Sequence, residues 1–144
     1  MSFIRGKIIQ GLGESKNTIK EQMPYFIKCF PEVAKCKLAT INIQLNKPLI
    51  ILTPDFTTEP LPWHPAFRVV KGGEIFKFLR IKLAVEGCEE VEAWIYKAQF
   101  SPYTKNPYYV EVLAPDIAFE GATDCSIQII SKCDEGVVVV SKEE

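Results

Sequence analysis

Residues 74–98 read EIFKFLRIKLAVEGCEEVEAWIYKA, two long apolar runs separated by a short acidic segment. The first run covers residues 74–85 and the second covers residues 91–98, and each has the composition of a strand. The segment between them, Glu86-Gly87-Cys88-Glu89-Glu90, is typical of a hairpin connection. We therefore predict two strands that are antiparallel neighbours in one sheet.

A second strand signal is the strict alternation of apolar and polar residues over residues 40–45. Alternate side chains of a strand point to opposite faces, so this pattern predicts a half-buried strand. Its apolar face would hold Ile41, Ile43 and Leu45, and its polar face would hold Thr40, Asn42 and Gln44. Shorter apolar runs predict further strands at residues 7–9, 49–52, 108–113, 126–130 and 137–140.

One helix is predicted before the alternating strand. Thr18 and Glu21 have the spacing of a capping box, and apolar residues then recur at helical intervals at Met23, Phe26, Ile27 and Phe30. Pro24 costs about 3 kcal/mol inside a helix, so the alternative is a helix that starts at Pro24 and ends by Pro31. One further helical turn is predicted at residues 116–119.

The whole pattern predicts a mainly β fold. A length of 144 residues is usual for one domain, and 47% hydrophobic with 24% charged residues is ordinary for a globular protein. About eight short strands with one or two short helices, without regular βαβ alternation, predict a small closed β-barrel over residues 1–144. Residues 53–65, with four prolines, would be either a functional lid or a plain surface excursion.

The charge and cysteine content exclude several classes of partner. A net charge of −1 leaves no positive field to hold nucleic acid, and Lys77, Arg80 and Lys82 are interpreted as a solvated strand face. Five cysteines without a Cys-x-x-Cys pair, and one histidine, argue against a zinc site. With no signal peptide or membrane-spanning run, we expect a cytoplasmic protein with reduced, mostly buried thiols and no membrane partner. The oligomeric state stays open.

Two polar segments are candidates for binding a nucleotide. Gly11-Leu12-Gly13-Glu14 follows a predicted strand, and its glycines would let backbone N–H groups approach a phosphate; the alternative is a simple tight turn. Thr40, Asn42 and Gln44 present neutral oxygens that could complete the shell of a phosphate-bound Mg²⁺. The alternative for these three residues is a solvated outer face.

Glu111 and His64 are the candidate acid–base residues. Glu111 stands in a largely apolar predicted strand, so it either faces solvent or lines a pocket, where it could accept a proton from a substrate hydroxyl or orient it. Histidine is the side-chain type that titrates near neutral pH, and we interpret the single His64 as a surface residue on a proline loop, with Trp63 beside it as a stacking lid. A third reading is an enzyme centred on His64 with Asp55 or Glu59.

Three motifs in order resemble the archaeal CTP-dependent riboflavin kinases. They are the glycine turn at residues 11–14, the Thr-x-Asn-x-x-Leu strand at residues 40–45, and the segment Val110-Glu111-Val112-Leu113-Ala114-Pro115. The likeness spans residues 6–130, and each motif is short. The resemblance implies a cradle-loop barrel that transfers a phosphoryl group from CTP to riboflavin, giving FMN and CDP, with Mg²⁺ as the cofactor.

The resemblance also implies roles for individual residues. Thr40 and Asn42 would be Mg²⁺ ligands, and Glu111 would meet the ribityl chain of the flavin. The nucleotide would lie against Gly11, Leu12, Gly13, Glu14, Ser15 and Lys16. The threonine of the family's flavin loop falls near Tyr103 or Thr104.

Three positions depart from the pattern of that family. Ser15 replaces its third glycine, Ala39 replaces the glycine before the threonine, and residues 116–119 lack the basic residue that follows its Ala-Pro. These departures favour an alternative to a kinase: a non-catalytic ligand-binding or assembly module on the same barrel.

Overall fold

The computed structural model describes residues 3–9, 15–64, 72–101, 106–117, 124–130 and 137–139. In this part of the chain the elements are β1 (Phe3–Ile9), α1 (Ser15–Cys29), the 3₁₀ helix η1 (Pro31–Lys35), β2 (Ile41–Leu45), β3 (Leu49–Ile51), β4 (Phe56–Thr57), β5 (Phe76–Val85), β6 (Val91–Ala98), β7 (Tyr109–Leu113), β8 (Asp124–Ile129) and β9 (Val137–Val139). Neither described helix is long and apolar enough to cross a membrane.

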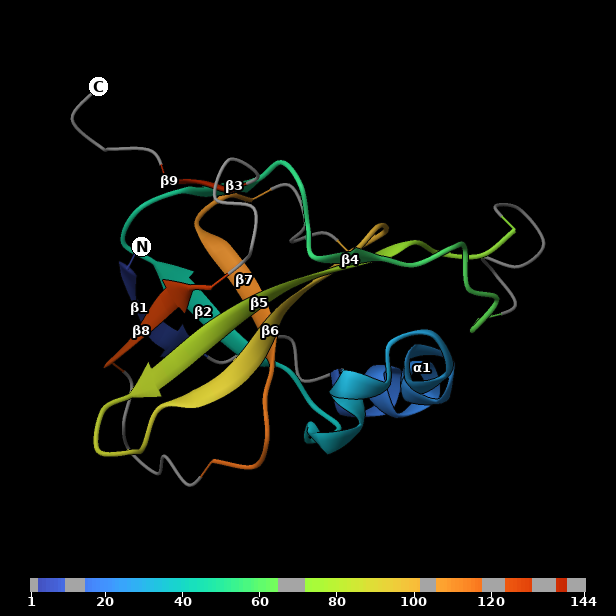
Figure 1. Cartoon of the computed structure of the whole chain (residues 1–144), viewed down its shortest axis with the longest axis horizontal. Helices are drawn as coiled ribbons and strands as arrows, with labels where there is room; N and C mark the ends of the chain where they lie inside the picture. The colour runs from blue at the N-terminus through green and yellow to red at the C-terminus, as the bar shows by residue number, and fades with distance from the viewer. Residues whose placement is uncertain are drawn as a thin grey trace.

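Six antiparallel strands close into a barrel, in the order β5-β6-β7-β2-β1-β8 with β8 pairing back to β5 (Figure 1). The predicted small closed β-barrel with few helices is therefore confirmed. Closure depends on the ten-residue strand β5. Its C-terminal half, from Ile81, pairs with β8, while its N-terminal half continues past the barrel and pairs with β4 at Phe78 and Lys77.

Alternation along β5 and β6 gives each strand two different faces. One face fills the barrel, where Ile81 and Ile95 have no exposed surface. The other face carries Phe78, Trp94 and Tyr96, which form a second apolar cluster with the helical layer. The two cores lie on opposite sides of one pair of strands, as the period-2 geometry of a strand requires.

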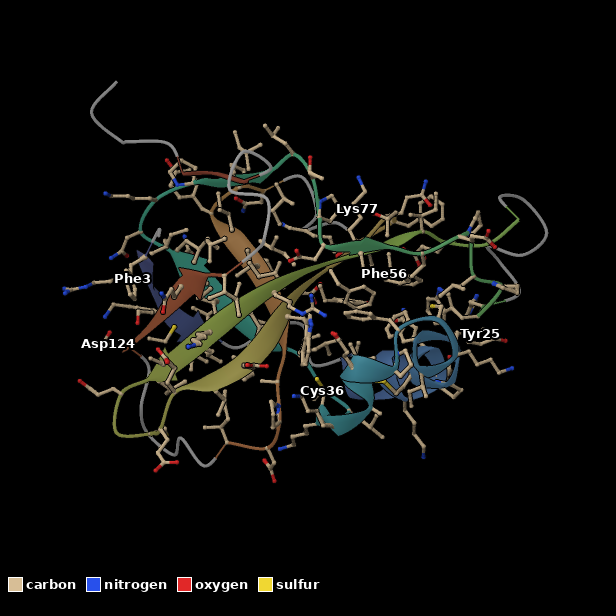
Figure 2. The ribbon with its side chains drawn as sticks, viewed as in Figure 1. Phe3, Tyr25, Cys36, Phe56, Lys77 and Asp124 are labelled. Carbon is tan, nitrogen blue, oxygen red and sulfur yellow. The ribbon has the colours of Figure 1, made fainter. Side chains whose placement is uncertain are left out.

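The helical layer is anchored by Phe26 of α1. Its ring is fully buried and makes edge-on contacts with Phe76, Phe78 and Tyr96, at centroid distances of 4.8, 5.2 and 5.9 Å. Figure 2 shows Phe56 pointing from β4 toward this layer, where it stacks on Phe30 at 4.7 Å. The extension of β5 beyond the barrel is thus the platform on which α1 packs.

The helix differs from its predicted form in three ways. It begins at Ser15, so the capping box at Thr18 is wrong, and it runs through Pro24, so the alternative start at that proline is wrong as well. Burial of the face that includes Phe26 compensates for the cost of the proline. Ile27, expected on the apolar face, is 39% exposed, and Gln22 is buried in that face instead.

The strand predictions hold, with shifts of a few residues at the ends. The turn at residues 86–90 joins β5 to β6 as expected, with Gly87 at a φ of +82° that only glycine adopts without strain. The irregular stretch at residues 53–65 contains β4, and Leu61 forms a β-bridge with Glu74. Of the predicted turn at residues 116–119, Asp116 and Ile117 are described and are not helical.

No disulfide joins the four described cysteines, and Cys133 lies outside the described residues. Cys36 and Cys125 are buried, and burial raises the pKa of each thiol to about 11. Such thiols stay protonated and unreactive at neutral pH. Cys29 is exposed, so the expectation of mostly buried thiols holds only in part.

A methyl group at Gly6 of β1 should destabilise the barrel, because a Cβ there would lie 2.7 Å from the carbonyl oxygen of Gln44 and 2.8 Å from Cγ2 of Ile43. Strand β2 cannot move away without breaking its pairing, so Gly6→Ala should cost about 1–3 kcal/mol. Urea unfolding measures the loss. Lys7→Ala, at the next and exposed position, is the control, and equal midpoints for both variants would contradict the prediction.

Candidate functional site

Polar side chains meet on the outward face of β2 and β7. Asn42 stands directly opposite Glu111 in the antiparallel pairing of these strands. The Thr40 hydroxyl lies 3.5 Å from Oδ1 of Asn42, at the long limit for a hydrogen bond. All three residues are half-buried, and we call them the polar face. Two motifs that lie about seventy residues apart in the sequence thus supply one group of oxygens.

The orientation of the polar face follows from the barrel core. Ile43 and Val112 are fully buried inside the barrel, so the residues next to them in the chain must point outward. On β6, the neighbour of Glu111 is Tyr96, which belongs to the cluster beneath α1. The polar face therefore adjoins the helical layer.

Tyr96 and Gln22 link the polar face to α1. The Tyr96 hydroxyl donates a 2.6 Å hydrogen bond to Oε1 of Gln22, which is 1% exposed. Burial raises the pKa of Tyr96 well above its usual value, and the charges of Glu111 and Glu74 raise it further. The phenol therefore remains a hydrogen-bond donor at all ordinary pH values.

Sequence reasoning missed both residues of this link, although each leaves a signal. Gln22 lies three residues after Ile19 and four before Phe26, so it shares their buried helical face. Tyr96 alternates with Trp94 and Ala98 on a single face of β6. A polar residue within an apolar stripe indicates a buried hydrogen bond.

Glu111 is in an electrostatically unusual position. Burial raises the pKa of its carboxyl group, and the Lys97 ammonium partly offsets this rise. Burial likewise lowers the pKa of Lys97, against the opposing effect of Glu111. A carboxylate whose pKa is raised toward neutrality is a better proton acceptor than an ordinary surface glutamate.

Most of the other predicted site residues lie outside the described part of the chain. Ile9, at the end of β1, pairs with Asn42, and α1 begins at Ser15. The backbone of Ser15 and Lys16 forms the start of α1, and their side chains are not described. The residues outside the described ranges are Gly11, Leu12, Gly13, Glu14, Tyr103 and Thr104.

The loop that carries His64 has structural contacts of its own. His64 is exposed, and the neighbouring Trp63 donates a 2.9 Å hydrogen bond to the buried carboxylate of Glu74. Asp55 accepts a 2.7 Å hydrogen bond from the backbone N–H of Arg80. The carboxylate of Asp55 therefore has a structural role, because it holds β5. Trp63 is fixed to Glu74, two residues before β5.

The polar face offers a metal ion neutral oxygens and one carboxylate. In the described part of the chain, no group of three or more His, Cys, Asp or Glu side chains is placed to hold a metal ion. The hydroxyl of Thr40 and the amide oxygen of Asn42 fit a hard cation such as Mg²⁺ that brings phosphate ligands with it. Neither protein-family models nor curated proteins match this sequence.

Glu111→Gln should make the protein more stable at pH 7. Because burial raises the folded-state pKa of Glu111, the folded protein holds this proton more tightly than the unfolded chain, and stability falls as the pH rises through the two values. The glutamine variant lacks this loss. Urea unfolding should therefore show a gain at pH 7 that disappears below about pH 4, where wild-type Glu111 is protonated.

Glu92→Gln is the control for this prediction, because Glu92 is an exposed carboxylate on β6. It should change the free energy of unfolding little at either pH. A Glu111→Gln protein that is less stable than the wild type at pH 7 would contradict the argument.

Proposed function

We propose that this protein is a Mg²⁺- and nucleotide-dependent kinase of a small molecule, with CTP as the phosphoryl donor and riboflavin as the substrate. The observation that carries the proposal is the register of β2 and β7, which sets Asn42 opposite Glu111 with Thr40 beside them. These are the three positions with described side chains to which the resemblance to riboflavin kinases gives a role.

The charges of the polar face suit a nucleotide-bound metal ion. Thr40 and Asn42 carry no charge, so they are weak ligands for a free cation, and the phosphates of a nucleotide would supply the missing negative charge. When bound, Mg²⁺ would neutralise charge on the transferring phosphoryl group. Thr40 and Asn42 would hold the metal–nucleotide complex in a fixed place on the barrel wall.

Glu111 would act on the acceptor hydroxyl. In the transfer, the terminal oxygen of the ribityl chain forms a bond to the γ-phosphorus of CTP, and the bond from that phosphorus to the β-phosphate oxygen breaks. The hydroxyl proton leaves to Glu111, and the products are FMN and CDP. A carboxyl with a pKa raised by burial is suited to this role, because it accepts the proton more readily.

The rigid setting of the polar face also supports catalysis by positioning. Glu111 stands at the centre of β7 between the buried Val110 and Val112, and it pairs with Asn42, which precedes the buried Ile43. Such a frame holds reacting groups within a small range of distances, which is the main contribution that a protein makes to phosphoryl transfer.

The proposal is tested by incubating the protein with riboflavin, Mg²⁺ and either CTP or ATP, and by separating FMN from riboflavin by chromatography. FMN should form only when metal and nucleotide are both present. Asn42→Ala should lower the rate roughly 100-fold, because it removes an oxygen at the place where charge is neutralised. Asn46→Ala, an exposed asparagine just beyond β2, is the matched control and should keep the wild-type rate.

Two outcomes would decide between a kinase and a binding module. Nucleotide or riboflavin binding in calorimetry without FMN formation would assign the barrel to a non-catalytic ligand-binding module, as the changes at Ser15 and Ala39 favour. If the protein binds no nucleotide at all, the kinase hypothesis is excluded, together with riboflavin as its substrate.

A further inference from the structure

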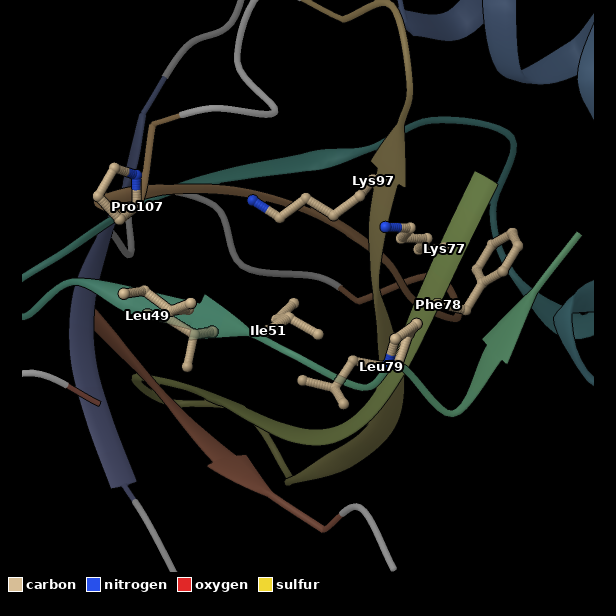
Figure 3. Close-up of a pocket in the computed structure, with 9 residues that line it drawn as sticks. Leu49, Ile51, Lys77, Phe78, Leu79, Lys97 and Pro107 are labelled. Atoms are coloured by element: carbon tan, nitrogen blue, oxygen red, sulfur yellow. The ribbon is translucent and has the colours of Figure 1, made fainter. Parts of the chain in front are cut away.

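A cavity of about 260 Å³ lies at one end of the barrel, between β3 and the paired strands β5 and β6. Its walls are largely aliphatic, with Leu49 and Ile51 from β3 and Leu79 from β5. Two lysines, Lys77 and Lys97, complete the lining on the side of the strand pair. Figure 3 shows the lysine side chains on one side of the cavity and the three aliphatic side chains on the other.

The two lysines are close enough for their positive charges to repel each other. Lys77 and Lys97 are directly opposite each other in the β5–β6 register. Side chains at such positions are neighbours, and like charges there are destabilising. None of the described residues that line the cavity is acidic, so the lining contributes two positive charges and no negative one.

The Lys97 ammonium makes one weak hydrogen bond to the described residues. It is half-buried and donates one long hydrogen bond, 3.4 Å, to the carbonyl oxygen of Tyr109. Within the described ranges of the chain, neither Lys97 nor Lys77 forms an ion pair. An ammonium group has three donors, and the hydrogen bond to Tyr109 uses one of them.

We propose that this cavity binds a small phosphate monoester whose other part is a compact apolar group. The phosphate would lie between Lys77 and Lys97, and the apolar group would pack against Leu49, Ile51 and Leu79. A phosphate monoester carries a charge of about −1.5 to −2 at pH 7, which matches two lysines better than a single carboxylate does. The cavity is slightly smaller than the roughly 300 Å³ at which pockets for drug-sized ligands begin, so the ligand is about the size of one ring.

This second site is separate from the polar face. Tyr96 and Lys97 are consecutive residues of β6, so their side chains leave the strand on opposite faces. Tyr96 lies beneath α1, next to Glu111 of the polar face, whereas Lys97 lines the cavity. The proposal for the cavity therefore does not depend on the kinase activity proposed above.

Phenyl phosphate is a suitable probe, because it combines a dianionic head with one apolar ring. Calorimetry should show saturable binding at least about tenfold tighter than that of inorganic phosphate or of benzyl alcohol, since each of these lacks one half of the interaction. In a methyl NMR titration, the largest shifts should fall on Leu49, Ile51 and Leu79. Equal affinity for phenyl phosphate and inorganic phosphate would overturn the proposal, as would shifts that fall elsewhere.

Lysine-to-methionine variants test the two charges while retaining most of each side chain. Lys97→Met should weaken phenyl phosphate binding about tenfold or more, because its ammonium is partly shielded from water. Lys77→Met should weaken binding about threefold, because Lys77 is exposed. Lys82→Met is the control: Lys82 is on β5, near Glu90 at 3.9 Å and outside the cavity lining, and its replacement should leave the affinity unchanged.

Loss of affinity in the Lys82→Met protein equal to that in Lys97→Met would overturn the proposal, because net charge alone would then explain binding. Lys97→Arg, which keeps the charge, should retain most of the affinity and serves if Lys97→Met does not fold. Asn42→Ala should bind phenyl phosphate as tightly as the wild type. This last variant distinguishes a failure of the cavity proposal from a failure of the kinase proposal.

Discussion

The strand β5 is the element on which the rest of the structure depends, because it closes the barrel and then extends beyond it. Its backbone hydrogen-bonds to β6 along most of its length, to β8 at one end and to β4 at the other. An uninterrupted strand of ten residues is needed for both tasks. Without the extension, Phe76 and Phe78 could not form the platform for Phe26 of α1. The barrel and the helical layer are therefore a single packing unit.

The alternation of side chains along β6 explains why two chemically different candidate sites lie on opposite sides of this strand. A strand presents alternate side chains to opposite faces, so β6 can place Tyr96 beneath the helix and Lys97 above β3 within one step of the chain. Both environments consist of ordinary strand residues without a strained backbone, because positive φ angles occur only at glycine in the described part of the chain. The registers of the strand pairs decide which side chains meet. The β2–β7 register sets Glu111 beside Asn42, and the β5–β6 register sets Lys97 beside Lys77.

Local features of this fold could be predicted from sequence, whereas features that depend on pairing could not. The alternation at residues 40–45 and the turn around Gly87 are local signals, and both are correct. The predicted start of α1 is wrong because the spacing of a capping box also occurs outside helix starts. The alternative start at Pro24 is wrong because the burial of Phe26 outweighs the local cost of the proline. The contact between Asn42 and Glu111 follows from barrel closure, which no local pattern encodes. Lys77 is an example: its sequence context predicts a solvated strand face, and its place in the cavity lining beside Lys97 follows only from the pairing of β5 with β6.

Glu111 connects the two sites electrostatically, although they lie on opposite faces. Burial raises the pKa of Tyr96, and the charge of Glu111 raises it further. Burial lowers the pKa of Lys97 and raises that of Glu111, and the attraction between these two charges partly offsets both shifts. A phosphate held by Lys97 would add negative charge, weaken that lowering effect and so favour the protonated form of Glu111. By thermodynamic linkage, protonation of Glu111 would strengthen phosphate binding to the same extent.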